Sequence, residues 1–137
     1  MELELGFLAD SAQASPDGKL FALGIGIDRV LSKEFPAVHP MMALVLKFKL
    51  HPSECDEQHA FEIELWNPDG QPGGVKIDGN FSSARPEAGK SGFVQLVVNL
   101  GQLRFETPGD YSFEVRVDKH HLKSIPLSLG VQPELST

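Results

Sequence analysis

The stretch Tyr111–Asp118, with the sequence YSFEVRVD, decides the fold class of this chain. Its large apolar residues at positions 111, 113, 115 and 117 alternate with polar residues at 112, 114, 116 and 118. Successive side chains of a β-strand point to opposite faces, so the alternation predicts a strand with one buried face and one solvated face. The rest of the chain repeats this alternation and shows no helical period of useful length.

About eight or nine short strands are expected in this chain of 137 residues. Besides the first stretch, alternation predicts strands at residues 2–9, 20–28, 44–50, 61–66, 75–81, 93–100 and 122–131. Long polar loops at 51–60 and 82–92 are suited to crossing between two sheets, which favours a sandwich over a barrel. We therefore predict an all-β, single-domain antiparallel β-sandwich, immunoglobulin-like or jelly-roll-like, over residues 1–131. Residues 132–137 are expected to form a flexible C-terminal tail.

Three of the predicted strands carry a more specific expectation. Leu3, Leu5 and Phe7 recur at every second position, so they are expected on the inward face of the first strand. The strand at 93–100 is the most apolar and is expected to lie centrally in its sheet. Pro126 has no backbone N–H to donate, so the last strand is expected at a sheet edge.

Composition and charge argue against several classes of partner. The chain carries 19 acidic and 12 basic residues, a formal net charge of −7. A net-negative domain without a basic block is a poor ligand for phosphate backbones or anionic lipid headgroups, so we expect neither nucleic-acid nor membrane binding. The N-terminal segment lacks the features of a signal peptide, and no stretch approaches the roughly 20 apolar residues that span a bilayer. A cytoplasmic location is therefore expected.

The loop at 51–60 contains candidate metal ligands at regular spacing. Three residues separate His51 from Cys55 and Cys55 from His59, and thiolate and imidazole groups are good ligands for zinc or copper. Side chains four residues apart converge only if the segment is helical, whereas Pro52 and the flanking strands favour an irregular loop. A structural zinc site also needs a fourth ligand, which a histidine at position 120 or 121 could supply. The alternative is a solvated polar loop.

Two glycine-containing motifs resemble nucleotide-binding loops but lack the necessary context. A predicted strand follows Gly89-Lys90-Ser91, whereas a phosphate-binding loop requires a helix at that point. Gly24-Ile25-Gly26 lacks the third glycine of a dinucleotide fingerprint, because Arg29 stands in its place. The glycines at 24 and 26 instead predict a bulge or a bend in the strand at 20–28. We therefore assign no cofactor.

The sequence contains no arrangement of residues typical of catalysis. No serine is framed by the Gly-x-Ser-x-Gly pattern, and Cys55 and His59 lack an orienting third residue. Acidic pairs such as Glu62 and Glu64 share the solvated face of a strand, which favours surface carboxylates over an acid–base pair. We assign no catalytic residue and expect the protein not to be an enzyme.

Apolar residues on outward strand faces define a candidate partner surface. Trp66 falls opposite the inward residues of its strand, and Val45 and Val97 enrich the outward faces of two other strands. Exposed aromatic and aliphatic side chains of this kind mark protein contacts. The alternative is that a loop such as 82–92 covers them.

The whole chain resembles a family of small bacterial proteins of similar length, most clearly in three parts. These parts are Leu5–Asp10 with Ser15–Lys19, Phe35–Pro40, and Pro108–Asp118. The family is an all-β domain of unknown function, so the resemblance implies a bacterial, stand-alone β domain and transfers no active site. The C-terminal alternation also resembles the last two strands of immunoglobulin-like modules, although fold alone does not determine function.

These features favour a non-enzymatic protein-binding or scaffolding module of a bacterial cell. Edge strands and loops of β-sandwiches are common contact surfaces, and the partner is a protein that the sequence does not identify. A homo-oligomer formed through an edge strand or an apolar sheet face agrees with the same features. The alternative function is binding of a metal or small ligand by the loop at 51–59.

Overall fold

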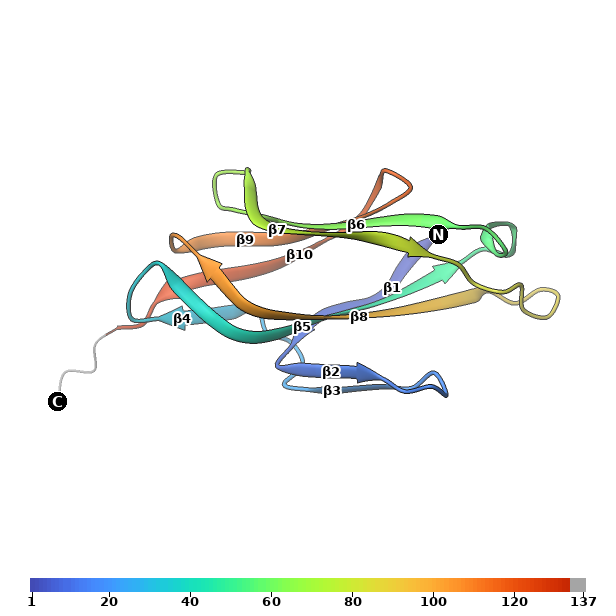
Figure 1. The fold of residues 1–137 in the computed structure, drawn as a ribbon, viewed down its shortest axis with the longest axis horizontal. Helices are drawn as coiled ribbons and strands as arrows, with labels where there is room; N and C mark the ends of the chain where they lie inside the picture. Colours follow the sequence, from blue (N-terminus) through green and yellow to red (C-terminus); the bar gives the residue numbers. More distant parts are fainter. Residues whose placement is uncertain (134–137) are drawn as a thin grey trace.

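The computed structural model describes residues 1–133 and confirms the predicted all-β class (Figure 1). Within these residues it contains ten strands and one 3₁₀ turn, more strands than expected. The predicted strand at 20–28 ends at Leu23, because Gly24 and Gly26 adopt φ angles of 68° and 93°, and two further short strands lie at Ser11–Ala14 and Arg29–Ser32. Residues 134–137, most of the predicted tail at 132–137, lie outside the described residues.

Two sheets form two layers, which Figure 1 shows one above the other. The three-stranded sheet has the order β1 (Glu2–Ala9), β5 (Ala37–Leu50) and β8 (Gly92–Phe105). The five-stranded sheet has the order β4 (Arg29–Ser32), β10 (His120–Val131), β9 (Gly109–Val117), β6 (His59–Trp66) and β7 (Pro72–Phe81). The loops at 51–60 and 82–92 cross between these sheets, as predicted. The pairing of β4 with β10 is parallel, so the expectation of a wholly antiparallel fold is wrong at that pair.

The hydrophobic core lies between the two layers. The inward residues of the predicted strands at 44–50, 61–66 and 111–118 are buried in one cluster, which also takes in residues of the last strand. The contribution of β5 is Leu44, Leu46, Phe48 and Leu50, and that of β9 is Tyr111, Phe113, Val115 and Val117. Alternation identifies the core side of these strands correctly because no register shift interrupts the β5–β8 or β6–β9 pairing.

A β-bulge in β1 overturns the predicted inward placement of Leu5 and Phe7. The pairing with β5 shifts between Leu3 and Leu5, so Leu3 lies opposite Phe48 whereas Phe7 lies opposite Val45. One extra residue exchanges the two faces of a strand. Leu3 therefore packs against the core, while Leu5 and Phe7 face away from it and Leu5 is exposed.

Two strand positions also differ from the expected ones. β8, expected at the centre of its sheet, lies at the edge of the three-stranded sheet, and β5 is central. β10, expected at an edge, lies between β4 and β9, but β4 pairs only with Ser128–Val131. Pro126 lies opposite Ser112 of β9, outside the segment that pairs with β4, so its missing N–H costs no hydrogen bond to a second strand.

A short hairpin, β2 (Ser11–Ala14) and β3 (Leu20–Leu23), forms a third layer on the outer face of the three-stranded sheet (Figure 1). β2 packs over β5 and β8. An isolated two-stranded hairpin is marginally stable at best, so this packing holds it in place. The outer face of β5 is therefore covered, and Val45 on that face is fully buried.

Hydrogen bonds fix the hairpin at its base and at its tip. At the base, Asp10 N–H donates to Leu23 O at 2.9 Å. At the tip, Gln95 Nε2 on β8 donates to Gly18 O at 3.0 Å. Gly24 has a positive φ, and a Cβ at this position would collide with the Asp10 side chain, so glycine is required where β3 ends. The hairpin is thus held in one orientation against the sheet.

Tyr111 fixes the corner at which the chain enters β9. Its hydroxyl donates to Thr107 O at 2.7 Å, and its ring packs edge-on against Phe105 with the ring centroids 5.0 Å apart. We expect Tyr111→Phe to lower the free energy of unfolding by about 1 kcal/mol, because it removes this hydrogen bond and keeps the ring packing. Equilibrium denaturant unfolding of the two proteins measures the difference, and an unchanged midpoint would contradict it.

Candidate functional site

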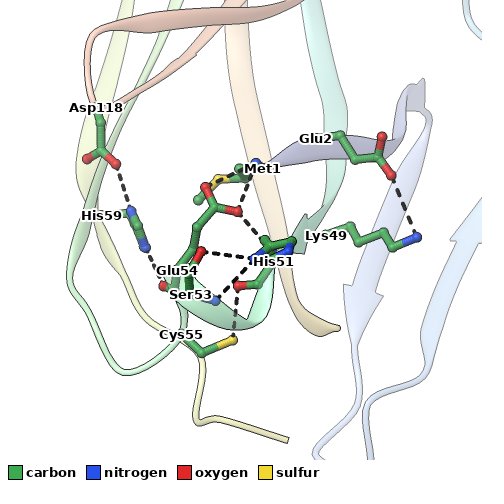
Figure 2. Close-up of polar contacts among 9 residues, drawn as sticks. All are labelled: Met1, Glu2, Lys49, His51, Ser53, Glu54, Cys55, His59 and Asp118. Carbon is green, nitrogen blue, oxygen red and sulfur yellow. Dashed lines mark hydrogen bonds and ion pairs between the residues drawn. The ribbon is translucent and has the colours of Figure 1, made fainter. Parts of the chain in front are cut away.

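The loop between β5 and β6, where the sequence predicts metal ligands, folds around one 3₁₀ turn, Pro52–Glu54 (Figure 2). His51 caps this turn through Nδ1, which lies 3.3 Å from the backbone nitrogen of Ser53 and 2.9 Å from its hydroxyl. In return, the Glu54 carboxylate accepts from the backbone N–H of His51 at 2.8 Å. This reciprocal capping closes the turn and occupies one nitrogen of His51.

His59 is a buried polar residue at the start of β6, only 5% exposed. Its Nδ1 lies 2.7 Å from Asp118 Oδ2, and its Nε2 lies 2.7 Å from the backbone oxygen of Glu54 (Figure 2). A carbonyl oxygen and an ionised carboxylate are acceptors only, so this geometry suits the imidazolium form of His59, in which both ring nitrogens donate. We call this double contact of His59 with Asp118 and the Glu54 carbonyl the His59 latch.

The His59 latch joins segments that lie far apart in the sequence. Asp118 and Lys119 form the tight turn between β9 and β10, with φ angles of 51° and 69°. The second oxygen of Asp118, Oδ1, accepts from the backbone N–H of Ala60 at 3.0 Å. The ring of Phe81 at the end of β7 lies 5.9 Å from the imidazole of His59, measured between centroids. The latch therefore connects the crossover loop to the β9–β10 turn.

The pKa values of the two ionised groups shift in opposite directions. Burial, the largest influence on His59, by itself lowers its pKa, but the hydrogen bonds to Glu54 and Asp118 and the two negative charges outweigh it, so the pKa of His59 is raised. The hydrogen bond from His59 is the largest influence on Asp118, and the pKa of this carboxyl is lowered. Both directions favour the ionised pair, in agreement with its hydrogen-bond geometry.

The three predicted metal ligands, His51, Cys55 and His59, are not arranged as a metal site. Both nitrogens of His59 are used in the latch, and the buried thiol of Cys55 donates to the backbone oxygen of His51 at 3.7 Å. Within residues 1–133, no group of three or more His, Cys, Asp or Glu side chains is placed to hold a metal ion. The four-residue spacing requires an α-helix to converge, and this loop contains a 3₁₀ turn instead.

A second polar cluster lies on the β9–β10 pair, around Glu114. Its carboxylate accepts from Ser112 at 3.0 Å, from Ser124, and from His121 Nε2 at 2.7 Å. Burial, the largest influence, raises the pKa of Glu114, but these hydrogen bonds outweigh it and the pKa is lowered. No local pattern in the sequence indicates this cluster, because it depends on the register that places Ser124 opposite Glu114.

The residue types of this cluster are those of a serine hydrolase, but the geometry is not. In a catalytic triad the histidine contacts the serine through one nitrogen and the acid through the other. Here the same atom, His121 Nε2, lies 3.1 Å from Ser124 Oγ and 2.7 Å from Glu114 Oε2. His121 therefore does not pass a proton from Ser124 to Glu114 in this arrangement, and the three side chains act as a surface hydrogen-bond network.

The residues predicted as a partner surface, Trp66, Val45 and Val97, do not lie on one surface. Val45 lies on the outer face of β5 as expected, but its expected exposure is wrong, because the hairpin covers this face and Val45 is fully buried. Val97 lies opposite Val45 on β8 and is half-buried. Trp66 belongs to the other sheet, opposite Ser112, and is also half-buried. The cover over Val45 is thus the hairpin and not a loop such as 82–92.

Exposed apolar residues gather instead on the hairpin. Phe21, Leu23 and Ile25 are 51%, 72% and 63% exposed. The pairing of β2 with β3 places Phe21 beside Gln13 and Leu23 beside Ser11, so these four share one side of the hairpin. Because Phe21 and Leu23 are exposed, this side points away from the sheet. We call Ser11, Gln13, Phe21 and Leu23 the hairpin face. Ile25 lies just beyond the end of β3.

A hollow of about 400 Å³ lies against the hairpin. Its lining consists of Ser11, Ala12, Gln13, Phe21, Ala22 and Leu23, none of which carries a charge. The outward positions of β6 and β9 differ sharply from this, because they carry charged residues such as Glu62, Glu64 and Arg116. The hairpin face itself therefore carries no charge, while the exposed Asp10 lies at the base of the hairpin.

A larger hollow of about 590 Å³ lies between the edge strands β7 and β8. It is lined by residues of Gly73–Lys76 and Asn99–Arg104 together with Glu106. Arg104 and Glu106 already pair at 2.6 Å, and Lys76 lies 3.4 Å from Glu62. The charged side chains that line this hollow thus already have ion-pair partners. They leave few free charges with which the hollow could recognise a ligand.

The comparison with protein families covers nearly the whole of this fold. Residues 4–130 match the model of DUF6941, which is described as a family of unknown function. The chain belongs to this family. The predicted resemblance to an all-β family of unknown function is thereby confirmed, and the matched residues of this DUF6941 member include both sheets and the hairpin. A search of curated proteins finds no match. No helix among the described residues is long and apolar enough to cross a membrane.

Proposed function

We propose that this DUF6941 member is a non-enzymatic protein-binding or scaffolding module that binds its partner through the hairpin face. The observation that supports the proposal is the exposure of Phe21 and Leu23 on one side of the hairpin, where the residues that line the hollow carry no charge. Burial of apolar surface is favourable by roughly 25 cal/mol per Å², and contiguous exposed apolar patches mark interaction sites.

The contrast between the hairpin and the other outward strand faces supports this proposal. On β6, β7 and β9 the solvated positions carry Glu62, Asp78 and Arg116, as expected for surfaces that face water. The hairpin is held in place by its base and tip, so Phe21 and Leu23 are presented in a fixed orientation. A preorganised surface loses less conformational entropy when it binds, which favours affinity.

We infer in addition that the scaffold is of the immunoglobulin-like type. The strand orders β1-β5-β8 and β4-β10-β9-β6-β7, and the hydroxyl of Tyr111 bonded to Thr107 at the entry to β9, support this inference. Domains of this architecture use loops and strand edges for contacts, which agrees with binding by an inserted hairpin. The proposed location is the bacterial cytoplasm, where a buried free thiol such as Cys55 stays reduced.

Affinity capture with the intact chain as bait tests the proposed function. The double variant Phe21→Ser with Leu23→Ser replaces the most exposed apolar groups of β3, and we expect it to lose at least about nine-tenths of the partner captured by the unmodified bait. Leu31→Ser, an exposed leucine on β4, is the matched control and should capture the partner normally. Equal capture by the double variant and the unmodified bait would refute the assignment of this surface.

A further inference from the structure

We propose that the His59 latch is a pH-dependent switch, which releases the crossover loop at 51–58 when His59 loses a proton and thereby uncovers the thiol of Cys55. The switch involves no residue of the hairpin face and does not rest on the proposed function. Three observations carry it: the double contact of His59, the small number of other contacts that hold the loop, and the position of Cys55 next to the peptide unit that the latch holds.

The two contacts of His59 require two ring protons. Neutral imidazole has one N–H donor and one acceptor nitrogen, whereas the Asp118 carboxylate and the Glu54 carbonyl both only accept. A hydrogen bond to a charged acceptor is the stronger one, so the remaining proton stays on Nδ1, which faces Asp118. The lone pair of Nε2 then faces the Glu54 oxygen at 2.7 Å, and this contact breaks. The loop side of the latch therefore opens while the side at the β9–β10 turn stays bound.

The charged groups around the imidazole keep the latch closed until the pH rises. In the β9–β10 turn, the Asp118 carboxylate contacts Nδ1, and His120 at the start of β10 acts on that carboxylate through its charge. In the crossover loop, the negative charge of Glu54 also acts on the imidazole, and it is paired with the N-terminal ammonium of Met1 at 2.8 Å. Burial lowers the pKa of His59, but the hydrogen bonds and negative charges outweigh it and raise this pKa. The loop should therefore open as the pH rises through the raised pKa.

Few other contacts join the crossover loop to the rest of the fold. Among residues 1–133, hydrogen bonds to other segments come from the Glu54 carboxylate, which accepts from the N-terminal ammonium, and from Asp56. Asp56 N–H donates to Ser83 O at 2.8 Å, and Asp56 Oδ1 accepts from Arg85 N–H at 3.1 Å. The Glu54 carbonyl that His59 holds belongs to the peptide unit between these two attachments. Loss of the latch therefore frees the backbone immediately before Cys55.

Cys55 is the residue whose surroundings change most when this peptide unit moves (Figure 2). Its side chain is 1% exposed, and a Cβ at Gly92 on β8 would lie 2.8 Å from its sulfur, so the thiol is packed closely against the backbone of β8. The hydrogen bond from the thiol to His51 O is long, at 3.7 Å, and stays within the loop. Opening of the loop should carry the sulfur away from β8 into solvent. Cys55 is the single cysteine of the chain, so its reactivity reports the switch.

Labelling of the intact chain with iodoacetamide, an uncharged thiol reagent, from about pH 5.5 to pH 9 tests the switch. At each pH, the rate for the chain unfolded in urea gives the intrinsic reactivity of the thiol, and the ratio of this rate to that of the folded chain measures protection. We expect protection to be constant below pH 6.5 and to fall at least about 10-fold as the pH rises through the raised pKa of His59, the factor that corresponds to loss of one hydrogen bond.

Three variants assign the pH step to the latch. His59→Gln is neutral at every pH, so its protection should be low and independent of pH. Asp118→Asn removes a negative charge that raises the pKa of His59, so its step should move to lower pH. His121→Gln removes a titrating side chain outside the latch and should keep the step of the unmodified chain. If His59→Gln does not fold, the displacement of the step in Asp118→Asn decides.

A second thiol separates opening of the loop from unfolding of the whole chain. Val115→Cys in a Cys55→Ser chain places the cysteine in the core of β9, where only global unfolding exposes it. This thiol should be labelled at least about 10-fold more slowly than Cys55. Its labelling rate should also respond more strongly to low urea concentrations, because global unfolding exposes more surface.

Three results would overturn the switch. One is constant protection of Cys55 over the whole pH range. Another is a pH step that persists unchanged in His59→Gln or Asp118→Asn, because a different group would then control the loop. The third is equal labelling of Cys55 and of the thiol introduced at position 115, since Cys55 would then be exposed only when the whole chain unfolds.

Discussion

Replacing His59 with alanine is expected to lower the free energy of unfolding by about 2–3 kcal/mol at pH 6. The substitution removes the hydrogen bonds to Asp118 and to the Glu54 carbonyl, and it leaves a space beneath the ring of Phe81. Loss of a fully buried ion pair costs about 3–5 kcal/mol and loss of an exposed pair at most about 1 kcal/mol. His59 is buried but Asp118 is 46% exposed, so an intermediate cost is expected.

The pH dependence of stability separates the charge of the His59 latch from its packing. The pKa of His59 is raised in the folded state. The contribution of His59 to folding stability is therefore complete below its ordinary pKa of 6.5 and is lost as the pH rises through the raised pKa. The lowered pKa of Asp118 sets the lower end of the pH range in which the ion pair stabilises the fold. The contribution of Asp118 to folding stability is present above its ordinary pKa of 3.8 and is lost as the pH falls through the lowered pKa. The two shifts describe one ion pair, so they bound a single pH range of greatest stability.

Denaturant unfolding at pH values from 5 to 9 measures both effects. The unmodified chain should lose the contribution of the latch as the pH rises above 6.5, and His59→Ala should lack this loss. Asp118→Asn is the conservative control, because asparagine tolerates the positive φ of the turn and still offers an oxygen to His59. It should weaken the pH dependence with a smaller loss of stability. Equal midpoints for His59→Ala and the unmodified chain at pH 6 would show that the latch contributes nothing.

Replacing Phe48 with alanine is expected to cost about 3–5 kcal/mol, the largest effect among the substitutions considered. Phe48 is fully buried on the central strand β5, and its ring stacks on that of Phe81 with centroids 4.9 Å apart. Phe81 also packs against Phe61 and against the imidazole of His59. The vacated space lies within this aromatic group, where the β-sheet backbone limits collapse, so most of the cavity should remain.

Phe93→Ala is the matched control for Phe48→Ala within the same pair of strands. Phe93 lies on β8, is half exposed, and contacts the ammonium group of Lys47 at 4.7 Å from the ring centroid. Its removal should cost at most about 1 kcal/mol. If Phe48→Ala does not fold, Phe48→Leu retains most of the volume and should cost about 1–2 kcal/mol in the same unfolding experiment. A cost for Phe48 no larger than that for Phe93 would contradict the assigned core.

The candidate sites show where sequence reasoning succeeded and where it failed. The sequence indicates the loop at 51–60 only as a candidate metal site, whereas the role of His59 depends on Asp118, which lies 59 positions further along the chain. The hairpin face was missed because alternation places Phe21 and Leu23 on one face of a single strand at 20–28 and does not indicate whether that face is exposed. Only the break at Gly24 and Gly26 turns this strand into a separate hairpin with its apolar side outward.

The sequence by itself determined the all-β class, the core side of β5, β6 and β9, and the two loops that cross between the sheets. These properties are local, because alternation along one strand fixes which side chains share a face. Only the tertiary structure decided the bulge that exposes Leu5, the hairpin layer that buries Val45, and the latch between His59 and Asp118. Each of these depends on hydrogen-bond register or packing between distant segments, and no local pattern of residues encodes such contacts.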